Sequence, residues 1–99
     1  MKKLLNTLYI TSENKYLSLD GENVVIKEEG AELGRMPLHN LEMIVTFSRA
    51  GASPALMGKC ADNNISIVFL TPSGSFLARV EGKTKGNVLL RKKQYEVAA

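Results

Sequence analysis

Short runs in which apolar and polar residues alternate dominate the first half of the chain, a pattern typical of β-strands. The first run lies within residues 4–12. The second and third runs, 16–19 and 24–26, flank an Asp-Gly-Glu-Asn segment at 20–23. Because Gly21 can adopt the positive φ angle that a tight turn needs, the second and third runs predict a β-hairpin.

A further strand is predicted over residues 33–38, after a turn formed by Glu-Glu-Gly-Ala at 28–31. Pro37 has no backbone N–H to donate, so this strand should lie at a sheet edge or end at Pro37. Short strands separated by turn residues at this spacing predict an antiparallel meander in the first half of the chain.

The second half combines a buried strand, a short helix and a hairpin. Residues 43–47 are apolar almost throughout, which predicts a buried strand. Ser53 is a good N-cap residue and Pro54 suits the first helical position, so a helix of about ten residues should begin here. Two more strands, 65–70 and 76–80, flank a Thr-Pro-Ser-Gly-Ser segment typical of a hairpin turn. The strand, helix, strand order permits one parallel crossover in an otherwise antiparallel arrangement.

These elements predict a mainly β (α+β) fold: a small β-sandwich-like domain of about six or seven strands with one internal helix. Residues 86–97, GNVLLRKKQYEV, predict the start of a C-terminal helix with Asn87 as its N-cap. We therefore divide the chain into a β-rich N-terminal domain at 1–82 and a hinge with the start of that helix at 83–99. A helix this short is marginal alone, so the chain is expected to be the front module of a longer protein.

Composition agrees with a folded domain. The chain has 99 residues, of which 44% are hydrophobic and 23% charged, the balance of one globular domain. Its apolar stretches are far shorter than the ~20 residues that a membrane span needs, so we expect no contact with a membrane. The single cysteine, Cys60, cannot form an internal disulfide, which fits a reducing, cytoplasmic setting.

Positive charge is concentrated late in the chain. Residues 1–48 hold five basic and seven acidic side chains, whereas 49–99 hold eight basic and three acidic ones. Such a concentration of charge can contact DNA phosphates or an acidic partner, and an ordinary solvated face explains it equally well. The candidate contacts with the DNA backbone are Arg79, Lys83, Lys85, Arg91, Lys92 and Lys93.

Residue types that catalysis needs are sparse. His39 is the only histidine, and no neighbouring cysteine or spaced carboxylate forms a metal-ligand pattern with it. Cys60 falls on the apolar side of the predicted helix with Leu56, Met57 and Ala61, which favours core packing over reactivity. The sequence therefore offers no catalytic, cofactor-binding or metal-binding residue, and a thiol or metal hydrolase based on Cys60 and His39 is the weakest hypothesis.

Two apolar segments fall on predicted edge strands, at Leu4-Leu5 and from Met36 to Leu38. An unpaired edge in a small β domain invites pairing with a second copy, so dimerisation is one use of the surface. The residue pattern alone leaves open a free-standing small dimeric β protein that binds nucleic acid or regulates transcription.

Four segments together resemble one known family, and they span nearly the entire chain. They are YLSLDGENVVI, PLHNLEMIV, GASPALMGKCADNNISIVFLTPSGSFLARVEG and GNVLLRKKQY. The chain resembles the N-terminal β-rich domain of Cas1, the CRISPR-associated endonuclease and integrase of spacer acquisition, and looks closest to its type I branch. Arg49 departs from the pattern, because an aromatic or small residue is expected at this position in relatives.

The resemblance implies a β-sandwich-like domain followed by a larger all-helical C-terminal domain. In that family the helical domain binds manganese or magnesium through a glutamate, a histidine and an aspartate, cleaves DNA and inserts spacers into the CRISPR array. Those positions are not among these 99 residues, so His39 inherits no metal-binding role. For this chain the resemblance implies a homodimerisation and scaffold domain without nuclease activity of its own. With the partner protein Cas2, it would help to hold duplex DNA, the protospacer and the CRISPR repeat, in antiviral defence.

Overall fold

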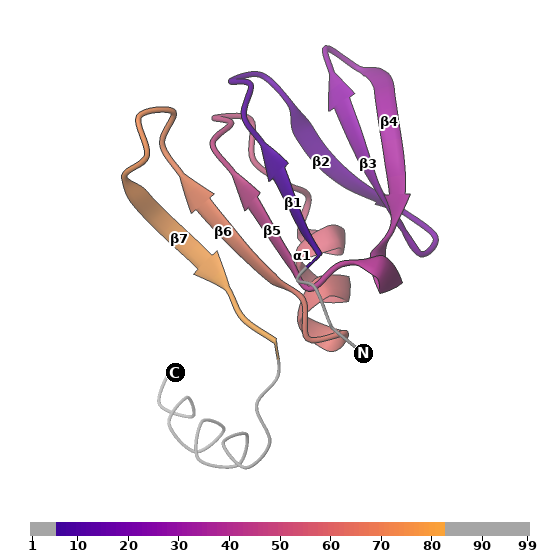
Figure 1. Ribbon diagram of the computed structural model, residues 1–99. Helices are drawn as coiled ribbons and strands as arrows, with labels where there is room; N and C mark the ends of the chain where they lie inside the picture. Colours follow the sequence, from indigo (N-terminus) through magenta and orange to yellow (C-terminus); the bar gives the residue numbers. More distant parts are fainter. Residues whose placement is uncertain (1–5, 83–99) are drawn as a thin grey trace, which may run out of the picture.

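The computed structural model describes residues 6–82. Seven strands, one α-helix and one short 3-10 helix make up this part of the chain, which confirms the predicted mainly β fold (Figure 1). In chain order they are β1 (Thr7–Ile10), β2 (Tyr16–Asp20), β3 (Asn23–Glu28), β4 (Ala31–Pro37), η1 (Leu38–Asn40), β5 (Met43–Thr46), α1 (Pro54–Asp62), β6 (Ser66–Leu70) and β7 (Phe76–Val80). The helix predicted at 86–97 lies outside the described residues.

The strands form two sheets, one with the order β1-β5-β6-β7 and one with the order β2-β3-β4. Figure 1 shows β7 at the edge of the larger sheet that lies farthest from β2, β3 and β4. Helix α1 contacts β2 of the smaller sheet and both β6 and β7 of the larger one. The helix therefore connects the two sheets and closes one end of the core between them.

The pairing of β1 corrects the sequence-based expectation. The antiparallel meander is confirmed for β2, β3 and β4. However, β1 pairs in parallel with β5, and β5 pairs in parallel with β6, so the larger sheet has two parallel pairs where one crossover was expected. In this register Leu8, Ile44 and Ile67 lie side by side, and all three belong to or pack against the core. Alternation in sequence shows which face of β1 is buried, but not which strand it will pair with.

The core receives side chains from both sheets and from the helix. Leu17, Val24, Ile44, Leu56 and Ile67 have no exposed surface. Burial of such side chains contributes about 1.5–3 kcal/mol each to the stability of the folded state. The two sheets and the helix are therefore held together by one shared apolar cluster.

Local signals at the helix and the first hairpin are confirmed. Ser53 is the N-cap of α1, and its Oγ accepts a hydrogen bond from the backbone N–H of Leu56 at 3.1 Å. Pro54 occupies the first turn, where its lack of an N–H costs nothing. Gly21 has a φ of +63° in the turn between β2 and β3. These residues begin the helix and reverse the chain as the sequence predicts.

The segment from Met36 to Leu38 offers less exposed apolar surface than expected. Strand β4 is an edge strand and ends at Pro37, as predicted. However, Leu38 is only 1% exposed and lies in the core, and Met36 packs against the core. Residues Leu4-Leu5, the other predicted edge segment, lie outside the described residues.

Candidate interaction site

Arg79 is the one predicted DNA contact that falls within the described residues, on the edge strand β7. Its side chain is 43% exposed, and its Nε forms an ion pair with Oε2 of Glu81. An exposed pair of this kind is worth about 1 kcal/mol or less, so it does not hold the guanidinium firmly. Its charge is nevertheless partly neutralised. The other five predicted contacts, Lys83, Lys85, Arg91, Lys92 and Lys93, lie outside the described residues.

Strand β7 exposes large apolar side chains. Phe76 is 62% exposed and Leu77 is 61% exposed, and Ala78 beside them is also exposed. The register of β7 against β6 shifts between Phe69 and Leu70, which makes Leu77 the additional residue of a β-bulge. Because of the bulge, three consecutive residues of β7, 76–78, are all exposed, whereas strict alternation would turn neighbouring side chains to opposite faces of the sheet.

Two adjoining hollows follow this strand. The smaller, of about 290 Å³, lies beside the turn that connects β6 and β7, and the larger, of about 420 Å³, lies between β7, α1 and the loop after β5. Arg49 and Leu77 line both. We call the larger hollow the β7 groove; its lining includes Ala50, Ala52, Met57, Phe69, Leu77, Ala78 and Val80. Its walls are mainly apolar, which suits another apolar surface better than a charged ligand.

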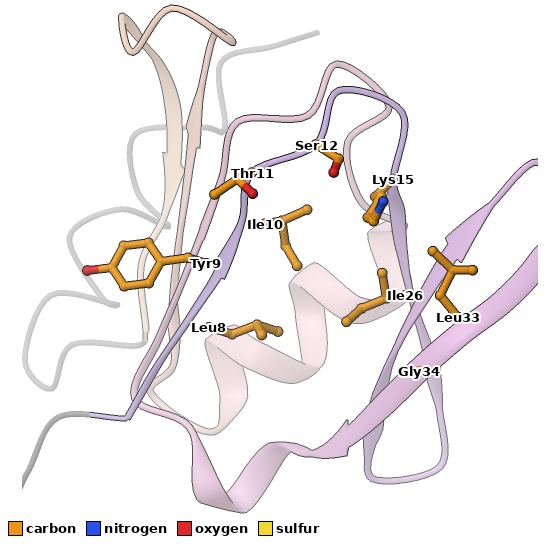
Figure 2. Close-up of a pocket in the computed structure, with 9 residues that line it drawn as sticks. All are labelled: Leu8, Tyr9, Ile10, Thr11, Ser12, Lys15, Ile26, Leu33 and Gly34. Carbon is orange, nitrogen blue, oxygen red and sulfur yellow. The ribbon is translucent and has the colours of Figure 1, made fainter.

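A third hollow, of about 270 Å³, lies where the two sheets open toward solvent between β1 and β4. Figure 2 shows Leu8, Ile10 and Ile26 pointing into the space between the sheets, whereas the Tyr9 ring points away from it. Leu33 of β4 borders this hollow and is 54% exposed. Like the β7 groove, this third hollow is lined mainly by apolar side chains and is open to solvent.

The thiol and the imidazole of the hydrolase hypothesis lie in environments that do not favour nucleophilic chemistry. Cys60 is completely buried, and burial raises the pKa of its thiol to about 11. His39 is exposed in η1. Because the thiolate is the reactive form, a buried cysteine with a raised pKa is a poor nucleophile near neutral pH.

A charged cluster on β4 was missed by sequence reasoning. Arg35 donates two hydrogen bonds to Glu32, of 2.8 and 2.9 Å, and a third of 3.0 Å to Asp20. The hydrogen bond from Arg35 lowers the pKa of Glu32, and the bonds to Glu32 and Asp20 raise the pKa of Arg35. All three groups are exposed, so the cluster adds solubility and polar character to β4 more than stability.

The family model described as CRISPR associated protein Cas1 matches residues 8–99. The chain belongs to the Cas1 family. It is 51% identical over 98 residues to the CRISPR-associated endonuclease Cas1 2 of Rhodospirillum rubrum, and 47% identical over 98 residues to the CRISPR-associated endonuclease Cas1 1 of Chlorobaculum tepidum. The alignments cover 99% of this chain but 28% and 29% of those relatives, so the chain spans less than a third of their length.

Solved structures of Cas1 proteins have the same fold. A CAS1 protein from Thermotoga maritima matches with a TM-score of 0.67 at 15% identity, over 95% of this chain and 30% of that one. A chain of a partial Cas6-RT-Cas1-Cas2 complex matches with a TM-score of 0.71 at 12% identity, over 95% and 27%. At these identities the likeness concerns the fold alone. The family model and the two sequence relatives confirm the resemblance to Cas1 inferred from the sequence, and its assignment to the type I branch stays a prediction.

Proposed function

We propose that this chain is the dimerisation and scaffold domain of a Cas1 protein that, as a whole, cleaves DNA and integrates spacers into the CRISPR array. The observation that carries this proposal is the match to the Cas1 family over residues 8–99. The described residues support it in a second way, because they offer exposed strands and apolar hollows suited to binding partners. No observation favours a free-standing nucleic-acid-binding or regulatory protein over this function.

The manganese or magnesium ion of the proposed activity does not fit the described residues. Among residues 6–82, no three His, Cys, Asp or Glu side chains lie close enough together to hold a metal ion. We therefore derive no catalytic step from this part of the molecule. We propose instead that the whole protein forms its metal site from other residues.

The proposed partners are a second copy of the chain, Cas2 and duplex DNA. One structural neighbour belongs to a complex of Cas1 and Cas2, and another, with a TM-score of 0.60, is a Cas1-DNA complex. These neighbours support the Cas2 and DNA partners by similarity of fold. The described residues contain no helix long and apolar enough to cross a membrane. We propose that the assembly acts in the cytoplasm.

An integration assay tests the proposed function. The whole Cas1 protein that contains this chain, combined with its Cas2, should insert a labelled DNA duplex into a plasmid that carries a CRISPR repeat when manganese or magnesium is present. The 99-residue chain should give neither insertion nor cleavage under the same conditions. Cleavage by the chain alone that disappears in a Cys60→Ala or His39→Ala variant would overturn the assignment in favour of a hydrolase.

A further inference from the structure

Gly82, the last described residue, lies very close to the residue that follows the end of α1. A β-carbon added to Gly82 would lie 2.6 Å from Cα and 2.6 Å from Oδ1 of Asn64, and 3.3 Å from the carbonyl carbon of Asn64. Carbon atoms in ordinary van der Waals contact stay about 3.5–4 Å apart. Any side chain at position 82 would therefore collide with the backbone of Asn64.

This constraint is specific to Gly82 among the glycines of residues 6–82. A β-carbon added to any of the other six would meet no atom of another segment within 4 Å. Gly58, in the middle of α1, is one of these six. Glycine is thus required at position 82 because another segment approaches it, and Gly58 provides a matched control.

Asn64 is held in a fixed conformation by the end of the helix. It has a φ of +59°, the left-handed conformation in which many helices end. Its N–H donates to the carbonyl of Ala61 at 3.3 Å, and the N–H of Ile65 donates to the carbonyl of Cys60 at 2.8 Å, the two hydrogen bonds of a Schellman motif. Ile65 is 2% exposed and belongs to the core. Asn64 therefore cannot move away from Gly82 without disturbing the helix end and a buried side chain.

The chain on the N-terminal side of Gly82 is fixed as well. Strand β7 ends at Val80, which pairs with Ile67 of β6 and packs against the core. One residue, Glu81, separates the strand from Gly82, and the hinge predicted from the sequence begins at residue 83. Among the described residues, the contact with Asn64 is therefore the last point at which the β-rich domain holds the chain before the hinge.

We propose that the contact between Gly82 and Asn64 sets the direction in which the chain leaves the β-rich domain, so that Gly82 is a positioning residue for the part of Cas1 that follows. This inference rests on the proposed function, in which residues beyond this chain form the metal site. Displacement of reacting groups by about 1 Å can cost on the order of 100-fold in rate, so the direction of this exit bears on the reaction.

Helix α1 is a suitable reference for such an exit. It contacts β2 of the smaller sheet and both β6 and β7 of the larger one, so its end has a fixed place in the whole domain. A methyl group at position 82 can be accommodated by movement of residue 82 itself, because β7 ends two residues earlier. Gly82→Ala should therefore redirect the chain and leave the domain folded.

Two spin labels on the whole Cas1 protein test the direction of the exit. One label is attached at Ser12→Cys, in an exposed loop of the β-rich domain, and the other at Ala99→Cys, beyond the predicted hinge. Cys60 is buried and stays in place, and exposed cysteines elsewhere in the whole protein are replaced. Double electron–electron resonance then gives the distribution of distances between the labels. We expect Gly82→Ala to shift the mean or the width of this distribution by about 4 Å, one Cα–Cα step, or more.

Gly58→Ala is the matched control, because it adds the same methyl group where space is open. It should leave the distance distribution unchanged. Asn64→Gly provides a second test, because it removes Oδ1 and gives the helix end more freedom to yield. Combined with Gly82→Ala, it should return the distribution at least part of the way to that of the wild type.

Integration activity and thermal unfolding separate positioning from folding. With Cas2 and a labelled duplex, Gly82→Ala should slow integration by the whole protein about 10-fold or more. Both Gly82→Ala and Gly58→Ala should keep the circular dichroism spectrum of the wild type, with thermal midpoints that change by less than about 4 °C. A purely structural role of Gly82 would lower the midpoint and leave the label distances unchanged.

The remaining outcomes separate this inference from the function on which it rests. Label distances that Gly82→Ala does not shift, or that Gly58→Ala shifts equally, would overturn the inference. A shift that Asn64→Gly does not reduce would assign the effect to a different contact and overturn it as well, as would a shifted distance with unchanged integration. Failure of wild-type Cas1 to integrate DNA, with label distances that Gly82→Ala still shifts, would overturn the proposed function and leave the contact as the fixed exit of the domain.

Discussion

The Oγ of Ser48 lies 2.7 Å from the carbonyl oxygen of Lys15, so a buried serine ties the loop after β5 to the loop before β2. The same hydroxyl lies 2.9 Å from the carbonyl of Glu13 and accepts a hydrogen bond from the N–H of Ala50 at 3.1 Å. The N–H of Arg49 also donates to Glu13, at 3.0 Å. Because Ser48, Arg49 and Ala50 line the β7 groove, these bonds fix one wall of this groove.

Ser48→Ala should destabilise the fold. The side chain is 5% exposed, and its removal leaves the carbonyls of the 13–15 loop and the N–H of Ala50 without their hydroxyl partner. We expect the free energy of unfolding to fall by about 1–3 kcal/mol in urea denaturation. Ser12→Ala, at an exposed position in the neighbouring loop, should change it by less than about 0.5 kcal/mol. Equal stability of the two variants would show that water replaces the hydroxyl at no cost.

Residues with strong local preferences were predictable from the sequence. Gly21 at the first hairpin and Ser53 with Pro54 at the helix start act through their own backbone geometry and hydrogen bonds, whatever the rest of the molecule does. Burial of Cys60 was predictable because a helical repeat places it on the apolar side with Leu56. These features needed no knowledge of distant contacts.

The bulges of the two sheets were not predictable, and the surfaces that depend on them were missed. Simple alternation places Glu32 and Arg35 on opposite faces of β4. In the structure Lys27 pairs with Glu32 and Val25 with Arg35, so a register shift brings the two charges to the same face. A bulge is decided by the packing of both strands and has no signal in one strand alone. The same argument applies to Leu77 on β7.

The alternation pattern of a single segment also does not predict whether its strand lies at the edge or in the middle of a sheet. The run at 76–80 predicts a strand, but only the strand order β1-β5-β6-β7 shows that it lies at the margin of the sheet. The sequence directed attention to Leu4-Leu5 and to Met36 to Leu38, whereas Phe76 and Leu77, two of the most exposed large apolar side chains among residues 6–82, lie on the edge strand β7. Which strand ends a sheet depends on long-range pairing, which local alternation does not encode.

The raised pKa of Cys60 predicts a fall in stability at alkaline pH. Burial raises the pKa of the thiol from 9.0 to about 11, so the folded state holds this proton more tightly than the unfolded state does. The stabilisation is fully present below about pH 9 and is lost as the pH rises toward 11. The free energy of unfolding of wild type and of Cys60→Ala should be measured by chemical denaturation at intervals of about half a pH unit between about pH 8 and 11. The difference between the two proteins isolates the contribution of Cys60 from that of other titrating groups. A parallel decline of both proteins would contradict the prediction.

The reactivity of the same cysteine should report on unfolding. A thiol reagent at pH 8 reaches Cys60 only when the core opens, because the side chain has no exposed surface. The rate of labelling should therefore rise with urea in step with the unfolded fraction measured by circular dichroism. Rapid labelling of the folded chain in the absence of urea would show that α1 separates from the core far more easily than its packing implies.

Glu81 should restrain the contribution of Arg79 to DNA binding. Its carboxylate pairs with Nε of Arg79 and adds negative charge beside the predicted basic segment. We expect Glu81→Gln to strengthen binding of a DNA duplex by the whole Cas1 protein about 2- to 5-fold, and Arg79→Ala to weaken it and to reduce the slope of log K against log salt by up to about 0.9. Arg35→Ala is the matched control, because this exposed arginine lies on the other sheet and is held by Glu32 and Asp20.

Fluorescence anisotropy over a series of salt concentrations distinguishes a phosphate contact from an indirect effect of the dimer. If Arg79 contacts DNA directly, Arg79→Ala lowers the salt slope while sedimentation shows an unchanged dimer. If Arg79 acts only through dimerisation, Arg79→Ala leaves the slope unchanged and alters DNA binding only as far as it alters dimerisation. An equal loss of affinity in Arg79→Ala and Arg35→Ala, with equal slopes, would remove Arg79 from the set of DNA contacts.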